Sequence, residues 1–245
     1  MDNAIYVGLS KQLVLQRELD IAANNLANVD TAGFKFEELM TTADPAAPAS
    51  TTGIPTPVTF VADAGVARDF TQGPLSQTGS PLDLAIAGQG FFQISTANGP
   101  RYTRDGRFKL DPTGKLVTQD GDAVQGDGGD IVIDPKKGQV SISPTGVISQ
   151  SGERVGKLPV VTFDDLSALS KEGNNQFSNA SNLTAQPSTS AMVEQGMLEG
   201  SNVQPIVQIT RLIEISRAYD AVTNMISAAS DLSKTAIQQL GSTTA

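Results

Sequence analysis

The sequence predicts an α+β fold in which N- and C-terminal helices pair as a coiled-coil-like stem and a central all-β domain is built from hairpins. Three observations lead to this prediction. Residues 1–30 and 206–240 have helical periodicity and almost no Gly or Pro, whereas residues 40–200 contain most of both. Two distant segments that each expose an apolar stripe can cover those stripes by packing against each other.

The N-terminal segment has apolar or small residues at helical spacing from Ile5 onward. The helix is expected to end by Asn28-Val29-Asp30, where Gly33 can take the left-handed conformation of a tight turn. A second apolar row, which includes Tyr6 and Leu9, widens the stripe. This helix is therefore expected to touch more than one neighbour.

The C-terminal segment has a more regular pattern. Pro205 suits the first helical turn, and Asn202 or Ser201 is expected to cap it. Steps of three and four residues then define an apolar seam, a heptad pattern, at Leu212, Ile215, Tyr219, Val222, Ile226, Ala229, Ser233, Ala236 and Leu240. We expect this seam to face the N-terminal helix or its copies in neighbouring subunits. An ordinary amphipathic helix on a globular core is the alternative.

The middle of the chain has the pattern of short strands. Residues 82–86 alternate as a half-buried strand does, and Phe91 to Ile94 follow a glycine turn. Asp105-Gly106 is the dipeptide of a tight hairpin turn. A Pro-Thr-Gly turn occurs twice, within residues 108–117 and 140–149, and predicts two hairpins of one design.

These patterns divide the chain into four parts. Residues 1–35 form the N-terminal helix of the stem, and residues 36–79 are a linker or extended region, rich in Ala, Pro, Ser and Thr over 40–60. Residues 80–190 form the β-rich body. Residues 191–245 form a connector and the helix that completes the stem.

Composition restricts the possible functions. The chain has no Cys and no His, which excludes thiolate nucleophiles, zinc–sulfur sites and a Ser-His-Asp triad. The formal charge is -9 and no basic stripe is present, so nucleic acid is not an expected partner. No window is apolar enough to span a membrane, and the N-terminus lacks the features of a cleaved signal peptide. We expect no cofactor, no small-molecule substrate and no enzymatic activity.

Two chemical alternatives remain open at this point. The acidic residues between Asp120 and Asp134 lie in a Gly-rich run, but their spacing does not fit a calcium loop, and turn chemistry explains them better. We therefore predict no metal site. A carboxylate-pair enzyme, such as a β-domain cell-wall hydrolase, is possible because any two acids could converge in the fold.

One dense polar motif stands out at the end of the first helix. Asn24, Asn25 and Asn28 lie where their helix propensity is poor. Local capping of a fraying helix explains them in one way. The other interpretation is that their amides satisfy backbone groups of neighbouring chains at a packed junction.

These residues also carry a resemblance. The run from Asn24 to Lys35 resembles the N-terminal signature of the flagellar rod and hook family. The run Gln195 to Val203, followed by Arg217-Ala218-Tyr219, resembles the C-terminal signature of that family, and Tyr102 to Phe108 resembles its β-domain signature. The opening residues resemble proximal rod members more than the distal rod protein.

The resemblance implies a structural subunit of the proximal rod of the bacterial flagellar basal body, in the periplasm. It implies export by the flagellar type III apparatus without signal cleavage, then helical assembly with other rod proteins and copies of itself to transmit torque. A distal rod or hook-type axial protein is the alternative within the family. The expected assembly interface comprises Asn24, Asn25, Asn28, Gly33, Phe34, Ser201, Asn202, Leu212, Ile215, Tyr219, Val222 and Ile226.

Overall fold

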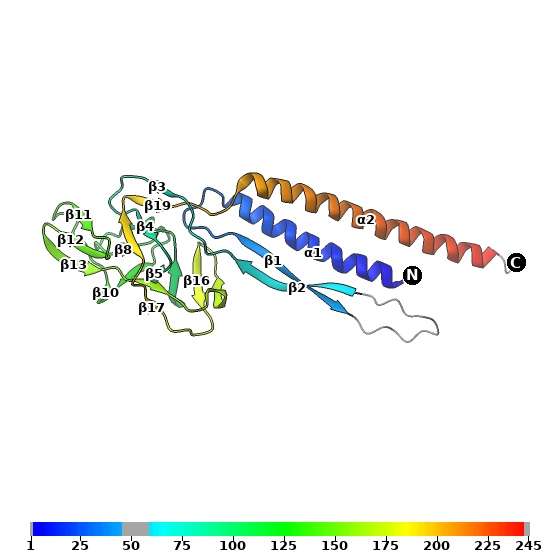
Figure 1. The fold of residues 1–245 in the computed structure, drawn as a ribbon, viewed down its shortest axis with the longest axis horizontal. Coiled ribbons are helices and arrows are strands. Elements are labelled where there is room, and N and C mark those ends of the chain that lie inside the picture. Colours follow the sequence, from blue (N-terminus) through cyan, green and yellow to red (C-terminus); the bar gives the residue numbers. More distant parts are fainter. Residues whose placement is uncertain (1, 46–58, 243–245) are drawn as a thin grey trace. The chain divides into compact units, whose positions relative to one another are not determined.

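The computed structural model describes residues 2–45 and 59–242, and these residues form two compact units (Figure 1). The helical unit comprises residues 1–27, 37–68 and 204–245. The β unit comprises residues 28–36 and 69–203. Each unit is therefore assembled from segments that are far apart in the sequence. Part of the predicted Ala- and Pro-rich linker, residues 46–58, lies outside the described residues.

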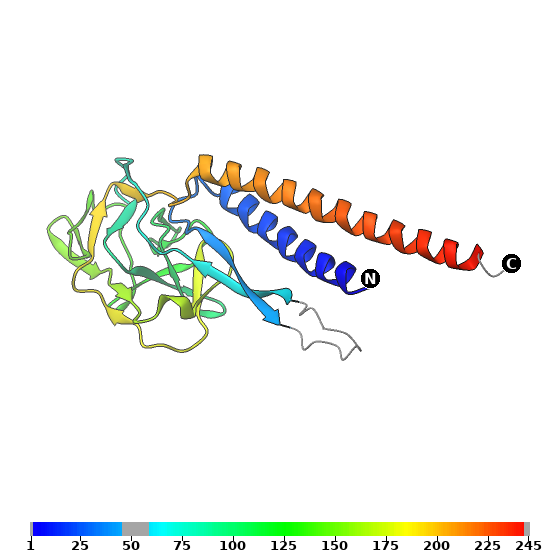
Figure 2. The same ribbon diagram turned by 45° about the vertical axis from the view of Figure 1, so that its right-hand side comes forward.

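The helical unit contains the helices α1 (Asp2–Ala27) and α2 (Pro205–Ser242) and the strands β1 (Glu37–Pro45) and β2 (Thr59–Arg68). The helices run side by side in opposite directions, and α2 extends beyond the N-terminal end of α1 (Figures 1 and 2). At about 1.5 Å per residue, the 38-residue α2 is roughly 57 Å long. Two paired helices from the chain ends confirm the predicted fold class.

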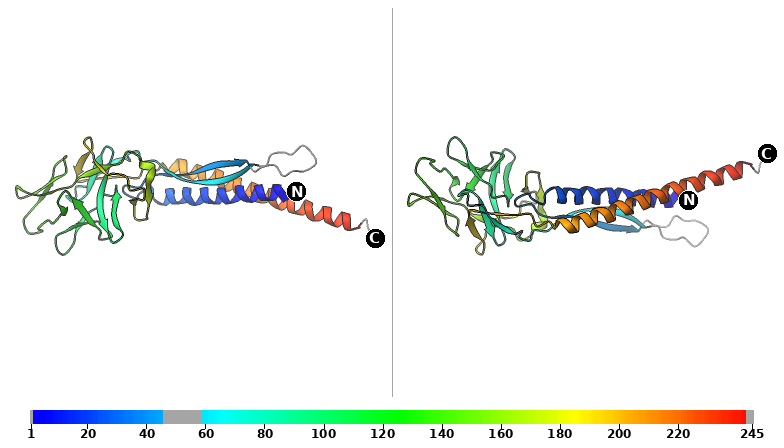
Figure 3. Two further views of the ribbon diagram at one scale, coloured as in Figure 1. Left: turned by 90° about the horizontal axis from the view of Figure 1, so that it is seen from below. Right: turned by 90° about the horizontal axis from the view of Figure 1, so that it is seen from above.

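The strands β1 and β2 form an antiparallel ladder that packs along α1 (Figure 3). The sequence predicted a linker or extended region here. The ladder is regular from Glu37 opposite Arg68 to Pro45 opposite Thr59, with one shift in register between Met40 and Thr41. Leu39 is buried, and both strands contact α1, which supports the pair because an isolated two-stranded ladder is only marginally stable in water.

The β unit is built from short strands and one 3-10 turn, η1 (Leu166–Ala168). The strands are β3 (Leu75–Gln77), β4 (Leu84–Ala87), β5 (Phe91–Thr96), β6 (Gly99–Thr103), β7 (Lys109–Leu110), β8 (Leu116–Val117), β9 (Ala123–Gly126), β10 (Gly129–Asp130), β11 (Val140–Ile142), β12 (Val147–Gln150), β13 (Glu153–Lys157), β14 (Val160–Thr162), β15 (Leu169–Lys171), β16 (Gln176–Asn179), β17 (Gln186–Pro187), β18 (Met192–Gln195) and β19 (Met197–Glu199).

The main sheet of the β unit runs in the order β15-β16-β6-β5-β9-β8-β7. Successive residues of β5 point to opposite faces of this sheet, as the pleat requires. Phe92 and Ile94 enter one apolar cluster, with Leu84 and Ile86, whereas Phe91 enters a second cluster that is rich in aromatic rings. The central strand thus serves two cores at once.

The two repeated Pro-Thr-Gly turns form the predicted hairpins, β7–β8 and β11–β12. Gly114 and Gly146 close them with positive φ values of 85° and 79°. In both turns the glycine amide donates a hydrogen bond to the residue three positions earlier, at 2.9 and 2.8 Å. This part of the prediction is confirmed.

The prediction of a hairpin turn at Asp105-Gly106 is wrong. The hairpin that joins β5 to β6 closes through Ala97 and Asn98 instead. Gly106 lies between β6 and β7, outside any turn, and a Cβ atom there would be 1.6 Å from the Leu84 carbonyl oxygen. The glycine is needed because two backbone segments approach closely, which a dipeptide pattern cannot distinguish from a turn.

Two smaller corrections concern burial and capping. Leu84, Ala85 and Ile86 are all buried, so β4 is covered on both faces and not on one as predicted. The helix α2 begins at Pro205, and Ser201 and Asn202 lie too far upstream to cap it. Asn202 bonds to other backbone segments, as described below.

Candidate functional site

A buried cluster of charges lies inside the β unit. The Glu199 cluster comprises Lys35, Arg104 and Glu199. The Lys35 ammonium is 2.5 Å from Glu199 Oε1, and Arg104 Nη1 is 2.9 Å from Glu199 Oε2. The side chains of Lys35 and Glu199 are fully buried, and that of Arg104 is nearly so. Such pairing is what permits charged groups to be buried at all.

Hydrogen bonds to the backbone surround the cluster. Glu199 Oε1 also accepts from the Gly73 amide at 3.0 Å, and Lys35 Nζ donates to the Thr71 carbonyl at 2.6 Å. Arg104 Nη2 donates to the Gly88 carbonyl at 2.9 Å. Only Arg104 Nε, among the buried side-chain nitrogens and oxygens of the described residues, has no hydrogen-bond partner.

Two cations share one carboxylate in this cluster. Burial lowers the pKa of Lys35, because water that would stabilise its ammonium is absent, and the attraction of Glu199 opposes this shift. Burial also lowers the pKa of Arg104, again against the attraction of Glu199. The cluster has no open face towards solvent. Its hydrogen bonds to the Thr71 and Gly88 carbonyls and the Gly73 amide fix these backbone segments in place.

The cluster joins the three sequence motifs that carried the family resemblance. Lys35 ends the N-terminal motif, Arg104 lies within the β-domain motif, and Glu199 lies within the C-terminal motif. The Gly33 amide also donates to the Glu199 carbonyl at 2.8 Å. Sequence reasoning missed Lys35, Arg104 and Glu199. The motifs of Lys35 and Arg104 also contain other charged residues, among them Asp30, Asp105 and Arg107, so no local signal marks these three as partners.

Gly33, Phe34, Ser201 and Asn202 surround the same junction. Gly33 has φ 68°, and a Cβ atom there would be 2.5 Å from the Arg104 backbone, so only glycine fits. Phe34 is buried, and the Lys171 ammonium lies 4.2 Å from the centroid of its ring. Ser201 is buried, and its hydroxyl accepts from the Val203 amide at 3.2 Å.

Asn202 connects three distant segments of the β unit through its side-chain amide. Its Oδ1 accepts from the Phe36 amide at 2.7 Å, and its Nδ2 donates to the Asp69 carbonyl at 2.8 Å. These bonds hold the segment before α2 against the segment that leads into β1 and the segment that follows β2. Asn202 is thus a local organiser of the β unit.

The part of the α2 seam from Leu212 to Ile226 faces α1 within the helical unit. Ile215 is buried in a cluster with Leu15 and Ala22, and Leu212, Tyr219 and Val222 pack around it. A Cβ atom on Gly8 would be 2.8 Å from Ile226, so Gly8 permits the close approach of the helices there. Between these points, Gln12 Nε2 donates to Thr223 Oγ1 at 3.2 Å. The predicted seam is therefore covered, at least in part, by the chain's own N-terminal helix.

The three asparagines have different surroundings. Asn25 is buried and bonds both backbone groups of Glu37, donating to its carbonyl at 2.7 Å and accepting from its amide at 3.0 Å. Asn28 Oδ1 accepts from the Thr31 hydroxyl at 3.1 Å, and the Asn28 carbonyl accepts from the Thr31 amide at 3.2 Å, so both bonds close a local turn. Asn24 is exposed. The Asn25 amide therefore serves a backbone segment of the same chain.

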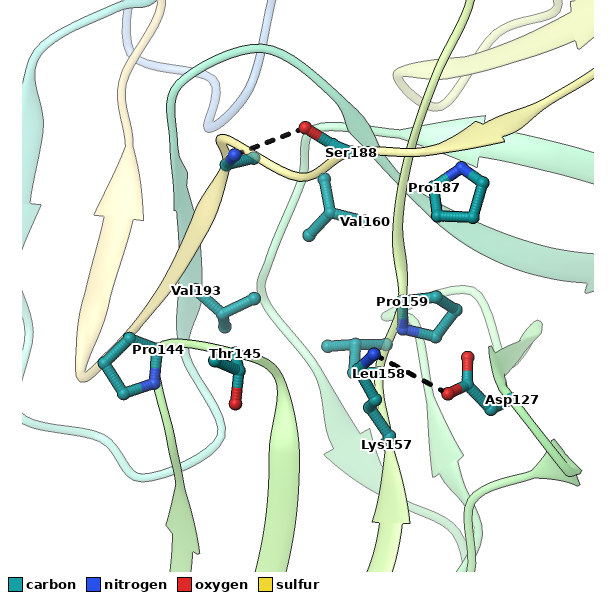
Figure 4. Close-up of a pocket in the computed structure, with 11 residues that line it drawn as sticks. Asp127, Pro144, Thr145, Lys157, Leu158, Pro159, Val160, Pro187, Ser188 and Val193 are labelled. Atoms are coloured by element: carbon teal, nitrogen blue, oxygen red, sulfur yellow. Dashed lines mark hydrogen bonds and ion pairs between the residues drawn. The ribbon is translucent and has the colours of Figure 1, made fainter.

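The β unit also has a small pocket of about 200 Å³, bordered by the β11–β12 turn, the end of β13 and the end of β17 (Figure 4). Leu158, Val160 and Val193 give it an apolar wall, and Lys157 and Asp127 form an ion pair across 3.8 Å at its rim. Ligand pockets are usually about 300 Å³ or larger. The pocket carries no chemistry that defines a substrate.

Two features of residues 2–45 and 59–242 bear on other classes of function. No group of three or more acidic side chains in these ranges could together hold a metal ion. Neither helix, over its described residues, is long and apolar enough to cross a membrane.

A buried junction of the chain ends, with helices that leave apolar side chains exposed, is typical of a structural protein that assembles. Three family models match the chain: "Flagella basal body rod protein" over residues 5–35, "Flagellar hook protein FlgE/F/G D1 domain" over residues 85–150, and "Flagellar basal body rod FlgEFG protein C-terminal" over residues 194–239.

Full-length relatives agree with these matches. The chain is 53% identical over 242 residues to the flagellar basal-body rod protein FlgF of Caulobacter vibrioides, covering 98% of this chain and 99% of the relative. It is 34% identical to FlgF of Mesorhizobium japonicum, covering 99% of each chain, and 32% identical to FlgG of Bacillus subtilis, covering 95% and 97%. The chain belongs to the flagellar basal-body rod protein family, and its strongest similarity among these relatives is to FlgF.

Proposed function

We propose that this protein is a structural, non-catalytic subunit of the proximal rod of the flagellar basal body. The observation that carries the proposal is the 53% identity to FlgF of Caulobacter vibrioides over nearly the whole of both chains. The proposal includes export through the flagellar type III apparatus, assembly in the periplasm with other rod proteins and with copies of itself, and transmission of torque. No cofactor or small-molecule substrate is part of it.

The structure supports a mechanical role through its two separate kinds of packing. The Glu199 cluster ties three segments of the β unit by short, charge-assisted hydrogen bonds, which hold direction as well as distance. The helical unit buries the seam of α2 against α1 and leaves apolar residues on the other faces exposed. A subunit that must transmit load benefits from a rigid body and from helices with free contact surfaces.

We further propose that the twelve interface residues named from the sequence act in assembly mostly by holding the subunit in shape. Gly33, Phe34, Ser201 and Asn202 order the junction, and the seam residues hold α1 against α2. Asn24 is exposed, and its proposed role is to face a neighbouring subunit.

A complementation experiment tests the proposal. A Caulobacter vibrioides strain that lacks its own FlgF is given this chain with an epitope tag. We expect swimming in soft agar to be restored, and the tagged chain to be present in purified basal bodies. A chain that is produced but absent from basal bodies would contradict the proposed function.

The distal rod is the second candidate, favoured by the FlgG relative from Bacillus subtilis at 32% identity. The same tagged chain separates the two possibilities in strains that lack either FlgF or FlgG. Rescue of the strain without FlgG, and not of the strain without FlgF, would assign the distal rod.

A further inference from the structure

Each helix of the helical unit carries three large apolar side chains on the face that is turned away from its partner helix. The α1 triad is Tyr6, Leu9 and Leu13, whose side chains are 47% to 61% exposed. The α2 triad is Ile206, Ile209 and Ile213, at 47% to 79% exposed. Both triads have the spacing i, i+3, i+7, which places their members in one row along a helix.

The two rows continue with the same residues, 200 positions apart. Arg17, Asp20 and Asn24 follow the α1 triad, and Arg217, Asp220 and Asn224 follow the α2 triad at identical intervals. All six are exposed. The two helices therefore present outer faces of one design.

The faces of α1 and α2 that contact each other show the same offset of 200 positions. Leu15 and Ile215, also 200 positions apart, are buried together where the helices meet. The contacts of Gly8 with Ile226 and of Gln12 with Thr223 show that the helices run in opposite directions through this contact. An α1-type face and an α2-type face thus already pack antiparallel within one copy.

We propose that the α1 triad of one copy packs, antiparallel, against the α2 triad of a second copy of this chain. The inference deepens the proposed function, on which it rests, by naming the partner and the contact. In the assembled array, each subunit would use its α1 triad towards one neighbour and its α2 triad towards another. Such a contact is heterologous, because it joins different surfaces of the two copies. In a dimer, the α2 triad of the first copy and the α1 triad of the second stay unused, so further copies can add at both ends.

The level of the triads along the helix pair sets the offset between copies. Gln12 lies level with Thr223, and Gly8 with Ile226, so the α1 triad lies near residue 225 of the same copy. That level is about 15 residues from the α2 triad, or roughly 23 Å at 1.5 Å per residue. Two copies that point in the same direction must therefore be shifted by about this distance along the helices.

A different antiparallel alignment competes with this one. It would bring Arg17 opposite Asp220 and Asp20 opposite Arg217 of a neighbour, with little axial shift. Exposed ion pairs contribute little because water and salt screen them, whereas removal of apolar area from water is the main source of affinity. In that alignment Leu13 would meet Asn224, so the apolar contact would be lost. The alignment of the triads is therefore favoured.

A second copy is the occupant because both complementary rows are present on one chain. A different protein would need to supply a matching row for each triad. Neither triad contains a charged residue that would select a partner of opposite charge. The two rows match each other in spacing, direction of the chain and apolar character.

Disulfide cross-linking tests the contact cleanly, because the natural chain has no cysteine. Leu9→Cys and Ile209→Cys are prepared as separate proteins with tags of different mass and mixed under mild oxidation. We expect a mixed dimer, and little dimer from either variant alone. A chain with both substitutions should form a ladder of dimers, trimers and larger species, since the two positions of one copy are too far apart to bridge.

Two controls accompany this experiment. The pair Asp20→Cys and Arg217→Cys reports the competing alignment. The double variant Gln12→Cys/Thr223→Cys should close within one chain and so show that the helix pair is formed. Dimers of Leu9→Cys alone, or cross-linking through positions 20 and 217 instead, would overturn the inference.

The same pairs are then introduced into the complemented strain and oxidised in purified basal bodies. Swimming together with a cross-link between positions 9 and 209 of two copies supports both proposals. Swimming with position 9 linked only to another protein, or not linked at all, overturns the inference and leaves the proposed function standing. Absence of the chain from basal bodies overturns the proposed function and the inference that rests on it.

Discussion

At the scale of single residues, the Glu199 carboxylate is the acidic group of the buried charge cluster in the β unit. It neutralises Lys35 and Arg104 from two other segments of the chain, in a place from which water is excluded. Charges in such a place are costly unless they are paired, so each partner makes burial of the others possible.

Glu199→Gln removes the negative charge with little change of shape and leaves two cations buried. We expect the free energy of unfolding of the β unit to fall by about 3–5 kcal/mol, the usual effect of breaking a buried ion pair. Urea unfolding followed by circular dichroism measures this. Glu172→Gln is the matched control, because Glu172 pairs with Arg101 at 2.6 Å but is 41% exposed, and should cost less than about 1 kcal/mol. Equal losses for both variants would contradict the argument.

A second prediction at this scale concerns Gly106. Gly106→Ala places a Cβ atom against the Leu84 carbonyl and strains the bond that the Leu84 amide donates to Gly106 at 3.0 Å. We expect a loss of about 1–3 kcal/mol, as for other overpacked positions. Gly128→Ala meets open space and should change stability by no more than about 0.5 kcal/mol. Thermal unfolding of the two variants compares them directly. If the unfolding temperature of Gly106→Ala equals that of the natural chain, the backbone at this position can move to accommodate the methyl group.

At the scale of elements, α1 is covered on more sides than α2, because β1 and β2 pack against α1. The side of α1 that faces β1 and β2 is covered, with Val14 buried. The corresponding side of α2 carries Val207 and Met225, which are both exposed. One hairpin can cover only one helix, so the second helix keeps an uncovered side.

The seam of α2 provides the prediction at this scale. Ile215→Asp places a charge in the apolar contact with Leu15 and Ala22, and Ile226→Asp does so beside Gly8. We expect the Ile215 variant to lose about 3 kcal/mol or more from the helical unit, because the carboxylate is buried without a partner. The β unit should stay folded, since its clusters are separate. Helix content by circular dichroism and swimming of the complemented strain are the measurements.

Gln238→Asp is the control for the seam, because Gln238 is exposed on the same helix. It should leave helix content close to that of the natural chain. Normal swimming of the Ile226→Asp strain would show that the seam does not need an apolar contact beside Gly8.

At the scale of the whole molecule, the β unit is closed by segments from both ends of the chain. The strand β18 pairs with β4, β19 pairs with β3, and Val193 lies in the main apolar cluster. Residues 191–203 thus belong to the β unit by their contacts. The sequence had assigned them to the connector of the stem.

Limited proteolysis tests this boundary. We expect the resistant fragment to end near residue 203, because Glu199 is buried and β18 and β19 are paired, whereas α2 begins with exposed Ile206 and Val207. Mass spectrometry of the limit fragment gives its end. A stable fragment that ends near residue 190 would contradict the role of the C-terminal motif in the β unit.

The sequence by itself determined the features that depend on local patterns. The two terminal helices, the Pro205 start, the left-handed Gly33 and the two Pro-Thr-Gly hairpins follow from spacing and backbone preference, and each is present. The family followed from motifs that are contiguous in the chain. The predicted site residues Gly33, Phe34, Ser201 and Asn202 were also taken from those motifs, and the structure brings all four to one junction.

Only the tertiary structure decided what depends on distant segments. Lys35, Arg104 and Glu199 are 69 or more residues apart in sequence, and no local pattern marks them as partners. The same holds for Gly106, where a glycine is required because the Leu84 carbonyl leaves no room for a side chain. It holds also for the β1–β2 ladder, which forms because α1 offers a free flank. Local sequence sets the preference of each segment, whereas burial and charge pairing are properties of segments brought together.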